Sequence, residues 1–243
     1  MIEVNDVNFG DCLQLMQEIP DKSIDMILCD LPYGTSKCKW DVVIPFEPLW
    51  KQYKRIIKDR GAIVLTATQP FTSLLVTSNL EMFKYEWIWN KIVGRGHLVA
   101  KKRPMCQHEN VLVFYKNAPT YNPQMVLMDK PQKGNSMESS RTQIMGGHTT
   151  KENEKVVRTH KYPKTIIVQG VDGNQAHPTQ KPVALFEYLI KTYTNEGEMV
   201  LDNCAGSCTT GIAAKSLNRY FICIEKDEEY YNIGKKRLMD NVR

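Results

Sequence analysis

The 243-residue sequence lacks both a long hydrophobic run and paired cysteine motifs. No apolar segment approaches the roughly 20 residues of a membrane-spanning helix, and the N-terminus has no basic-then-apolar signal, so we expect a cytoplasmic protein without a membrane partner. The seven cysteines include no CxxC pair, and no histidine stands at a zinc-like spacing from them. We therefore predict reduced thiols and no metal site.

The sequence instead alternates strand-like and helix-like segments. Strands are predicted at 23–30, 61–68, 85–93, 109–116, 198–202 and 219–225, and helices at 46–59, 70–80, 182–194, after Thr209 and from Asp227. This alternation predicts an α/β fold with a mainly parallel, twisted sheet and helices on both faces. The length and the hydrophobic fraction of 42% fit one domain over residues 1–243.

Residues 118–176 interrupt this alternation with weak periodicity and many Pro, Gly, Asn, Gln, Ser and Thr residues. The segment contains eight Lys or Arg residues and five acidic residues. A long surface loop has such a composition, and so does an insertion that grips a partner. The residues alone leave both interpretations open.

Two segments far apart in the sequence each place an acid directly after a predicted strand. In DMILCDLPYG (25–34) the acid is Asp30, and in MVLDNCAGSCTTGIAA (199–214) it is Asp202, followed by small residues and a helix. Small residues let a ligand approach the backbone, and a helix N-terminus offers unpaired N–H groups. Because parallel strands end at one edge of a sheet, we expect both segments to face one cleft.

The loop after Asp202 suits a nucleoside cofactor. Glu225 ends the next predicted strand, a place where an acid can bind ribose hydroxyls. The loop lacks the lysine that a phosphate-binding loop needs, so S-adenosylmethionine fits better than a nucleoside triphosphate. An ordinary turn between strand and helix is the plainer alternative.

Four motifs resemble those of DNA amino-methyltransferases, which methylate the exocyclic amino group of adenine or cytosine. DLPYG (30–34) resembles the DPPY motif, LDNCAGSCTT (201–210) resembles LDPFAGSGTT, and HPTQKP (177–182) and the opening segment 9–34 are also similar. The catalytic motif precedes the cofactor loop, which is the circularly permuted order of the family's β class. The resemblance covers roughly residues 3–117 and 176–240, with a target-recognition segment expected at about 118–176.

The resemblance implies a Rossmann-like S-adenosylmethionine-dependent methyltransferase fold and a role for each motif residue. The Asp30 side chain and the Leu31 carbonyl would bind the amino hydrogens of a flipped base, Pro32 would stiffen the turn, and Tyr33 would stack on the base. Lys181 would meet the carboxylate of the cofactor. The implied cofactor-binding residues are Asp11, Cys12, Asp30, Thr179, Lys181, Asp202, Ala205, Gly206, Ser207 and Glu225.

The sequence departs from the family pattern in three places. Leu31 replaces a proline, Asn203 and Cys204 replace Pro-Phe, and Cys208 replaces a glycine. If position 208 needs a positive φ, the cysteine costs about 1–2 kcal/mol. Weaker cofactor binding is one expected consequence of these changes.

Double-stranded DNA is the expected partner, and one basic segment suits its phosphates. Residues 91–108 contain no acid, and the protein has a net charge of +5. A solvated loop has the same composition, but a glycine-containing basic loop after a strand suits a phosphate backbone. The predicted DNA-binding residues are Lys91, Arg95, His97, Lys101, Lys102 and Arg103.

Three functions follow from these residues. Asp30 in place of serine favours methylation of adenine at N6, with cytosine N4 as the alternative. A non-catalytic DNA-binding relative, disabled by Cys204 and Cys208, belongs to a different class, and intact Asp30, Tyr33 and Glu225 argue against it. By analogy with the β class, we expect a bacterial or phage restriction-modification context and a homodimer.

Overall fold

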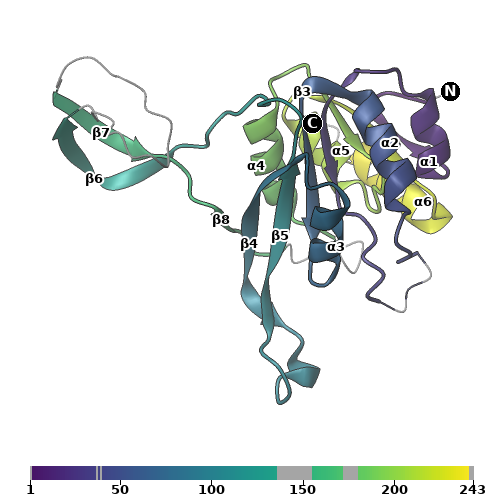
Figure 1. Ribbon diagram of the computed structural model, residues 1–243, viewed down its shortest axis with the longest axis horizontal. Helices are drawn as coiled ribbons and strands as arrows, with labels where there is room; N and C mark the ends of the chain where they lie inside the picture. Colours follow the sequence, from purple (N-terminus) through teal and green to yellow (C-terminus); the bar gives the residue numbers. More distant parts are fainter. Residues whose placement is uncertain (1, 37, 39, 136–154, 172–179, 241–243) are drawn as a thin grey trace. The chain divides into compact units, whose positions relative to one another are not determined.

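The computed structural model describes residues 2–36, 38, 40–135, 155–171 and 180–240 (Figure 1). The chain forms two compact units. The larger unit comprises Met1–Asn122 and Thr165–Arg243, and the smaller unit comprises Pro123–Lys164. Among the described residues, no helix has the length and apolar character needed to cross a membrane.

The larger unit is built on an eight-stranded sheet in the order β1-β10-β9-β2-β3-β5-β4-β8. Strand β5 is antiparallel to both of its neighbours, and the other pairs are parallel. The mainly parallel sheet predicted from the alternating segments is therefore confirmed. The strands are β1 (Asp6–Phe9), β2 (Ile24–Cys29), β3 (Ile57–Ala67), β4 (Phe83–Arg95), β5 (Cys106–Phe114), β8 (Ile166–Val168), β9 (Met199–Asp202) and β10 (Tyr220–Glu225).

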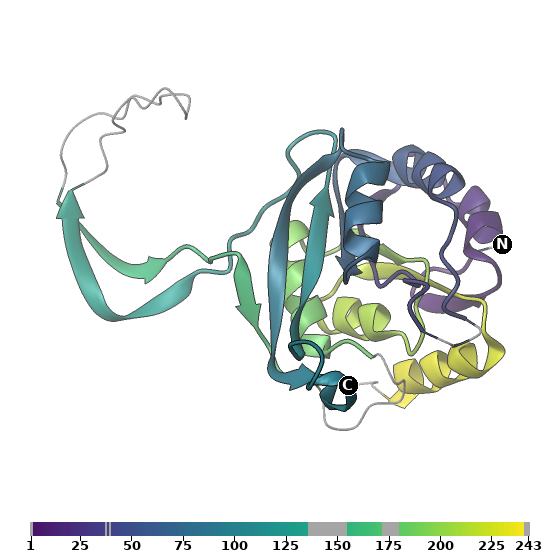
Figure 2. The ribbon, with the colours of Figure 1, turned by 60° about the horizontal axis from the view of Figure 1, so that its bottom comes forward.

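Helices cover both faces of this sheet (Figures 1 and 2). Alternate residues of β2 face opposite ways, as the strand pleat requires: Met26 and Leu28 pack with the helices α4, α5 and α6, while Ile27 and Cys29 pack with α1, α2 and α3. These two apolar clusters form the core on either side of the sheet. The helices are α1 (Cys12–Leu15), α2 (Phe46–Ile56), α3 (Phe71–Ser78), α4 (Val183–Tyr193), α5 (Thr209–Ser216) and α6 (Glu228–Asp240), with 3-10 turns η1 (Met16–Glu18) and η2 (His97–Val99).

Strands β2 and β9 are direct neighbours although about 170 residues separate them in the chain. Met26 pairs with Val200 and Ile27 pairs with Leu201 in a parallel register. Strand β9 then pairs with β10. The residues that follow or end these three strands therefore meet at the carboxyl edge of the sheet, as the sequence predicted.

The predicted boundary between the helix at 46–59 and the strand that follows it was wrong. The helix expected at 46–59 ends at Ile56, and Ile57 begins β3, where it pairs with Ile24 of β2. Both Ile56 and Ile57 are buried, so apolar spacing could not locate the change from helix to strand. Strand β1 and helix α1 were not predicted as elements.

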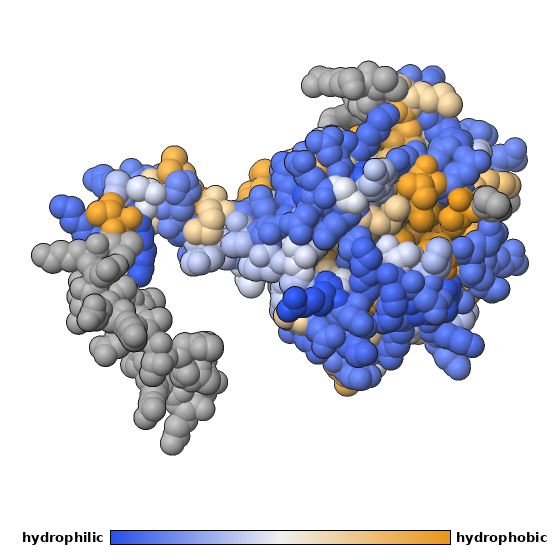
Figure 3. Space-filling view, turned by 90° about the horizontal axis from the view of Figure 1, so that it is seen from above, coloured by the Kyte–Doolittle hydropathy of each residue, from blue (hydrophilic) through white to orange (hydrophobic). Residues whose placement is uncertain are grey.

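The weakly periodic segment 118–176 contains more structure than its composition indicated. In the smaller unit, β6 (Val126–Asn135) and β7 (Lys155–Lys161) form an antiparallel pair. Strand β8, from the same segment, pairs with β4 in the main sheet. The face seen in Figure 3 is mostly hydrophilic, with apolar side chains reaching it in small groups.

Candidate active site

A cavity of about 510 Å³ lies at the carboxyl edge of the sheet in the larger unit. Asp30 follows β2, Asp202 ends β9 and Glu225 ends β10, and all three side chains line this cavity. The two segments singled out in the sequence are therefore brought together. Most predicted site residues line the same cavity: Asp11, Cys12, Asp30, Leu31, Pro32, Tyr33, Lys91, Arg95, Lys181, Asp202, Ala205, Gly206, Ser207 and Glu225.

Three donors hold the Asp30 carboxylate. The Tyr33 hydroxyl donates to Oδ1 over 2.6 Å, and the Thr66 hydroxyl donates to the same oxygen. Lys181 Nζ lies 2.6 Å from Oδ2. Burial raises the pKa of Tyr33 well above its ordinary value, so its phenol remains a donor at neutral pH. Asp30 is thus fixed in place at the cavity wall.

The turn after Asp30 is anchored in the core. Leu31 is 3% exposed and belongs to the apolar cluster of α2 and α3. The Tyr33 ring stacks against Phe71 of α3, with 5.2 Å between ring centroids. Leucine lacks the ring that stiffens a proline backbone, but its buried side chain anchors the turn by packing in the core.

Lys181 lies between two carboxylates. Its Nζ is 3.3 Å from Glu109 Oε2, in addition to its contact with Asp30. Glu109 also pairs with Lys91 through Oε1. Burial lowers the pKa of Lys181, but the charges of Asp30 and Glu109 outweigh burial and raise it above the usual lysine value. The lysine is therefore charged at neutral pH.

Sequence reasoning missed Glu109 and Thr66. Glu109 was assigned to the strand segment HENVLVFYK, and Thr66 to an almost wholly apolar strand. Both lie near the carboxyl edge of the sheet. Leu65, next to Thr66, pairs with Cys29 at the end of β2, and Asn110, next to Glu109, pairs with Ala67 at the end of β3. An acid or hydroxyl within an otherwise apolar strand was the available signal.

Two acids at strand ends, Asp202 of β9 and Glu225 of β10, hold the loop that follows β9. Asp202 accepts the Thr210 hydroxyl over 2.5 Å and the Cys204 N–H over 3.1 Å. Burial raises the pKa of Asp202 to about 6. Glu225 Oε2 accepts the N–H of Gly206 over 2.7 Å, and Oε1 accepts that of Asp227 over 2.8 Å. Burial also raises the pKa of Glu225.

The departures from the family loop have local partners. Asn203 is buried and accepts a hydrogen bond from the Tyr53 hydroxyl of α2 over 2.5 Å. Cys208 has φ 60°, the left-handed conformation that favours glycine. Its side chain is fully buried, with Sγ 3.5 Å from Sγ of Cys223. The strain expected at position 208 therefore applies.

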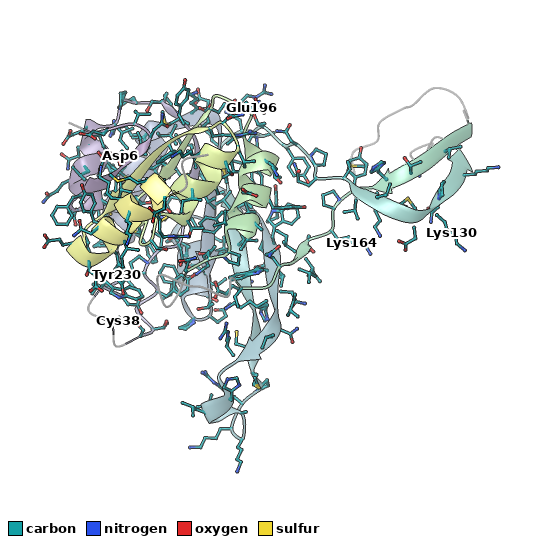
Figure 4. All side chains as sticks on the ribbon, turned by 180° about the vertical axis from the view of Figure 1, so that it is seen from behind. Asp6, Cys38, Lys130, Lys164, Glu196 and Tyr230 are labelled. Atoms are coloured by element: carbon teal, nitrogen blue, oxygen red, sulfur yellow. The ribbon has the colours of Figure 1, made fainter. Side chains whose placement is uncertain are left out.

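The remaining wall of the cavity comes from the segment between β2 and α2. Asp41 is buried and accepts three backbone N–H groups, from Gly34, Thr35 and Ser36, over 2.6–2.9 Å. The Trp40 ring meets Tyr230 of α6 edge-on at 6.3 Å, and Figure 4 shows Tyr230 and Cys38 on the same side of the larger unit. Sequence reasoning missed Asp41, because no local pattern shows which backbone an aspartate will cap.

Asp11 and Cys12 begin α1 beside this cavity. Asp11 caps the helix by accepting the N–H groups of Leu13 and Gln14. The neighbouring Cys204 thiol and burial raise the pKa of Cys12, and burial raises that of Cys29 to about 12. These thiols are protonated at neutral pH. Among the described residues, no group of three or more His, Cys, Asp or Glu side chains could hold a metal ion.

The predicted DNA-binding residues divide into two groups. Lys91 is largely buried by its pairing with Glu109. The hairpin between β4 and β5 extends beyond the sheet in Figure 1, and nitrogen-tipped side chains surround its end in Figure 4. Arg95, His97, Lys101, Lys102 and Arg103 are all exposed on this hairpin. Thr179 lies outside the described residues.

Comparison with known proteins identifies relatives along nearly the whole chain. A family model described as DNA methylase, N6 and N4, matches residues 24–236. The DNA adenine methyltransferase YhdJ of Escherichia coli (strain K12) is 30% identical over 252 residues, covering 97% of this chain and 83% of YhdJ. The type II methyltransferase M1.MboII of Moraxella bovis is 29% identical and covers 96% of this chain and 95% of its own.

Solved structures share the fold. A complex of M1.HpyAVI with SAM has a TM-score of 0.64 at 24% identity, covering 96% of this chain and 98% of its own. The PvuII DNA methyltransferase, described as cytosine-N4-specific, has a TM-score of 0.70 at 16% identity, covering 98% of this chain and 87% of its own. The Rossmann-like methyltransferase architecture expected from the motifs is confirmed.

Proposed function

This chain belongs to the DNA methylase family, and we propose that it transfers the methyl group of S-adenosylmethionine to the N6 amino group of adenine in double-stranded DNA. The observation that carries this proposal is the position of the Asp30 carboxylate. It lines the same cavity as the Asp202 loop and Glu225, so an amino group and a methyl donor can meet there.

The cavity fits S-adenosylmethionine in size and in chemistry. Its volume of about 510 Å³ lies within the usual range of ligand sites. Gly206 has φ 50°, and the loop it belongs to exposes backbone that a ligand can approach closely. In our proposal Glu225 holds the ribose, and Asp11, Asp202 and Gly206 line the remaining cofactor site. When bound, the cofactor supplies an electrophilic methyl group on its sulfonium.

Asp30 prepares the amino group for attack. A carboxylate oxygen has two acceptor sites, and Lys181 occupies one of those on Oδ2. The second site on Oδ2 accepts one amino hydrogen, and the carbonyl of Leu31 accepts the other. These bonds favour a pyramidal nitrogen whose lone pair is withdrawn from the ring. Asp30 also stabilises the positive charge that develops on that nitrogen.

Tyr33 has a second role in this proposal besides stacking on a flipped base. Its hydroxyl donates to Asp30, and its ring packs on Phe71, so it connects the catalytic carboxylate to the core. The exposed hairpin residues bind DNA phosphates, which supply affinity without reading sequence.

Two observations favour adenine over cytosine. The catalytic motif begins with Asp30 rather than serine, and the relative that is 30% identical is named a DNA adenine methyltransferase. We place this activity in the cytoplasm of a bacterium or a phage-infected cell and expect a homodimer, which sedimentation of the purified protein would test.

Methylation of unmodified genomic DNA tests the proposal directly. The purified protein is incubated with S-adenosylmethionine and DNA, and modification-sensitive long-read sequencing then reports the base and its sequence context. We expect N6-methyladenine at one recognition sequence. Detection of N4-methylcytosine would show that the target base is cytosine and not adenine. Cofactor binding without any modified base would indicate a non-catalytic DNA-binding protein.

Asp30→Ala is the corresponding active-site variant. It removes the acceptor for the amino hydrogen and should abolish most methyl transfer while calorimetry shows nearly unchanged cofactor affinity. Asp59→Ala, an exposed aspartate paired with Lys22 on the surface, is the matched control and should retain activity. Loss of cofactor binding with the fold retained in Asp30→Ala would contradict the assigned role.

A further inference from the structure

Glu109 is a buried carboxylate in the cavity that the proposed reaction does not use. It is 8% exposed and lines the cavity from β5. Its Oε1 pairs with Lys91, and its Oε2 lies 3.3 Å from Lys181 Nζ. Among the described residues, Oε2 makes no hydrogen bond. A buried carboxylate in this state is costly unless nearby charges compensate it.

Four charges alternate through this part of the cavity. Asp30, Lys181, Glu109 and Lys91 follow one another in contact, and their formal charges sum to zero. Without Glu109, Asp30 would be the only carboxylate partner of Lys181 in the described part of the chain. The lysine would then be free to move toward Asp30 and to obstruct the second acceptor site on Oδ2. With Glu109 present, Lys181 is drawn in two directions and held between them.

We propose that Glu109 is a positioning residue for methyl transfer, because it holds Lys181 and thereby fixes the orientation and charge balance of Asp30. This inference rests on the proposed function. It also assigns Lys181 to the protein's own carboxylates in place of the cofactor carboxylate. Lys181 is 6% exposed and already has two anionic partners, which leaves little room for a third.

A double-mutant cycle tests whether Glu109 acts through Lys181. Glu109→Gln keeps the shape of the side chain and removes its charge, and we expect kcat to fall roughly ten- to a hundredfold with little change in KM for DNA. Lys181→Met should also lower kcat. If Glu109 acts through Lys181, the double variant should have the kcat of Lys181→Met within about twofold. Effects that multiply would overturn the inference.

The alkaline side of the pH–rate profile gives a second readout. Within the described ranges, Asp30 and Glu109 are the two carboxylates that face Lys181, and the Tyr33 ring lies 5.7 Å from its Nζ. Glu109→Gln removes one of the two charges that keep Lys181 protonated while leaving the lysine buried. The fall in kcat at alkaline pH should therefore begin at a lower pH in this variant. A residue that only supports the fold would leave that limb unchanged.

The controls separate this inference from the proposed function. Glu86→Gln alters an acid on neighbouring β4 that accepts a hydrogen bond from Asn110, and it should behave like the wild type. Calorimetry should show unchanged cofactor affinity in Glu109→Gln and Lys181→Met. A loss of affinity in Lys181→Met would show that this lysine binds the cofactor and would overturn the inference. If Glu109→Gln unfolds, Glu109→Asp replaces it in the cycle. A wild type that transfers no methyl group would overturn the proposed function and this inference together.

Discussion

Cys208 allows backbone strain to be measured separately from side-chain packing. It is the N-cap of α5, with φ 60° and ψ 39°, at the position where the LDPFAGSGTT motif that this loop resembles has glycine. A side chain in this conformation costs about 1–2 kcal/mol. The same side chain is fully buried and touches Cys223 through the two sulfur atoms, 3.5 Å apart. Substitution therefore changes two opposing contributions to the free energy of unfolding.

Replacement by alanine and by glycine distinguishes these contributions. Cys208→Ala removes the buried sulfur and keeps the strain, so we expect a loss of about 1 kcal/mol. Compared with Cys208→Ala, Cys208→Gly removes one more buried carbon and makes the unfolded chain more flexible. Together these two effects lower the free energy of unfolding by about 1.5 kcal/mol. Cys208→Gly also relieves strain of similar size. The two variants should therefore unfold within about 0.5 kcal/mol of each other.

Cys223 supplies the matched control. It loses the same sulfur contact, lies in the middle of β10, and is not among the residues with positive φ. Cys223→Gly should be less stable than Cys223→Ala by about 1.5 kcal/mol, or roughly 3–6 °C in Tm for a chain of this size. Urea unfolding or calorimetry measures both pairs. An equal gap at positions 208 and 223 would refute the strain argument. Calorimetric titration should also show cofactor affinity in Cys208→Gly equal to or better than that of the wild type.

Three further predictions concern the loop, the cavity wall and the hairpin. Glu225→Gln should weaken cofactor binding about tenfold or more without changing DNA affinity, because an amide cannot accept both N–H groups that Glu225 now accepts; calorimetry with the cofactor and anisotropy with DNA measure the two affinities. Burial raises the pKa of Asp41, but the N–H groups of Ser36, Gly34 and Thr35 outweigh it and hold that pKa below its ordinary value. Its stabilisation is complete above the unfolded value of about 3.9 and is lost as pH falls through the folded value, so Tm should depend less on pH below about 4 in Asp41→Asn than in the wild type. Alanine at Lys101, Lys102 and Arg103 should weaken binding to target and scrambled duplexes by a similar factor and make the slope of log affinity against log salt shallower by about 0.9 for each phosphate contact removed; an unchanged slope with lost discrimination would assign base reading to this hairpin.

The sequence was sufficient to predict the edge of the sheet at which the site lies. Asp30, Asp202 and Glu225 each follow or end an apolar strand, and parallel strands with crossover helices bring such residues together whatever their separation in the chain. That inference needs only the direction of the strands. It does not depend on the contacts of any side chain. The error at the boundary between α2 and β3 therefore left it unaffected, because that error does not change the direction of a strand.

Side-chain contacts between different elements could not be predicted from the sequence. Thr66, Asp41 and Glu109 act on Asp30 or on the cavity wall through partners 5–72 residues away. Their residue types fit ordinary alternatives equally well: a threonine in a strand, an aspartate in a turn, an acid at the start of a strand. Only the register of β2, β3 and β5 decides that Thr66 meets Asp30 and that Glu109 lines the cavity.

Lys181 shows how contacts within the protein bear on the role that a motif implies. The motif HPTQKP predicted a lysine near the cofactor, and the lysine does line the cavity. The resemblance placed Lys181 near the methionine end of the cofactor, where a lysine can meet its carboxylate. The protein supplies two anions of its own, Asp30 and Glu109, at 2.6 and 3.3 Å. Since a buried charge needs a partner in the free protein as well as in the complex, a lysine in a ligand cavity is better assigned to internal carboxylates first, and to the ligand only when its affinity depends on that lysine.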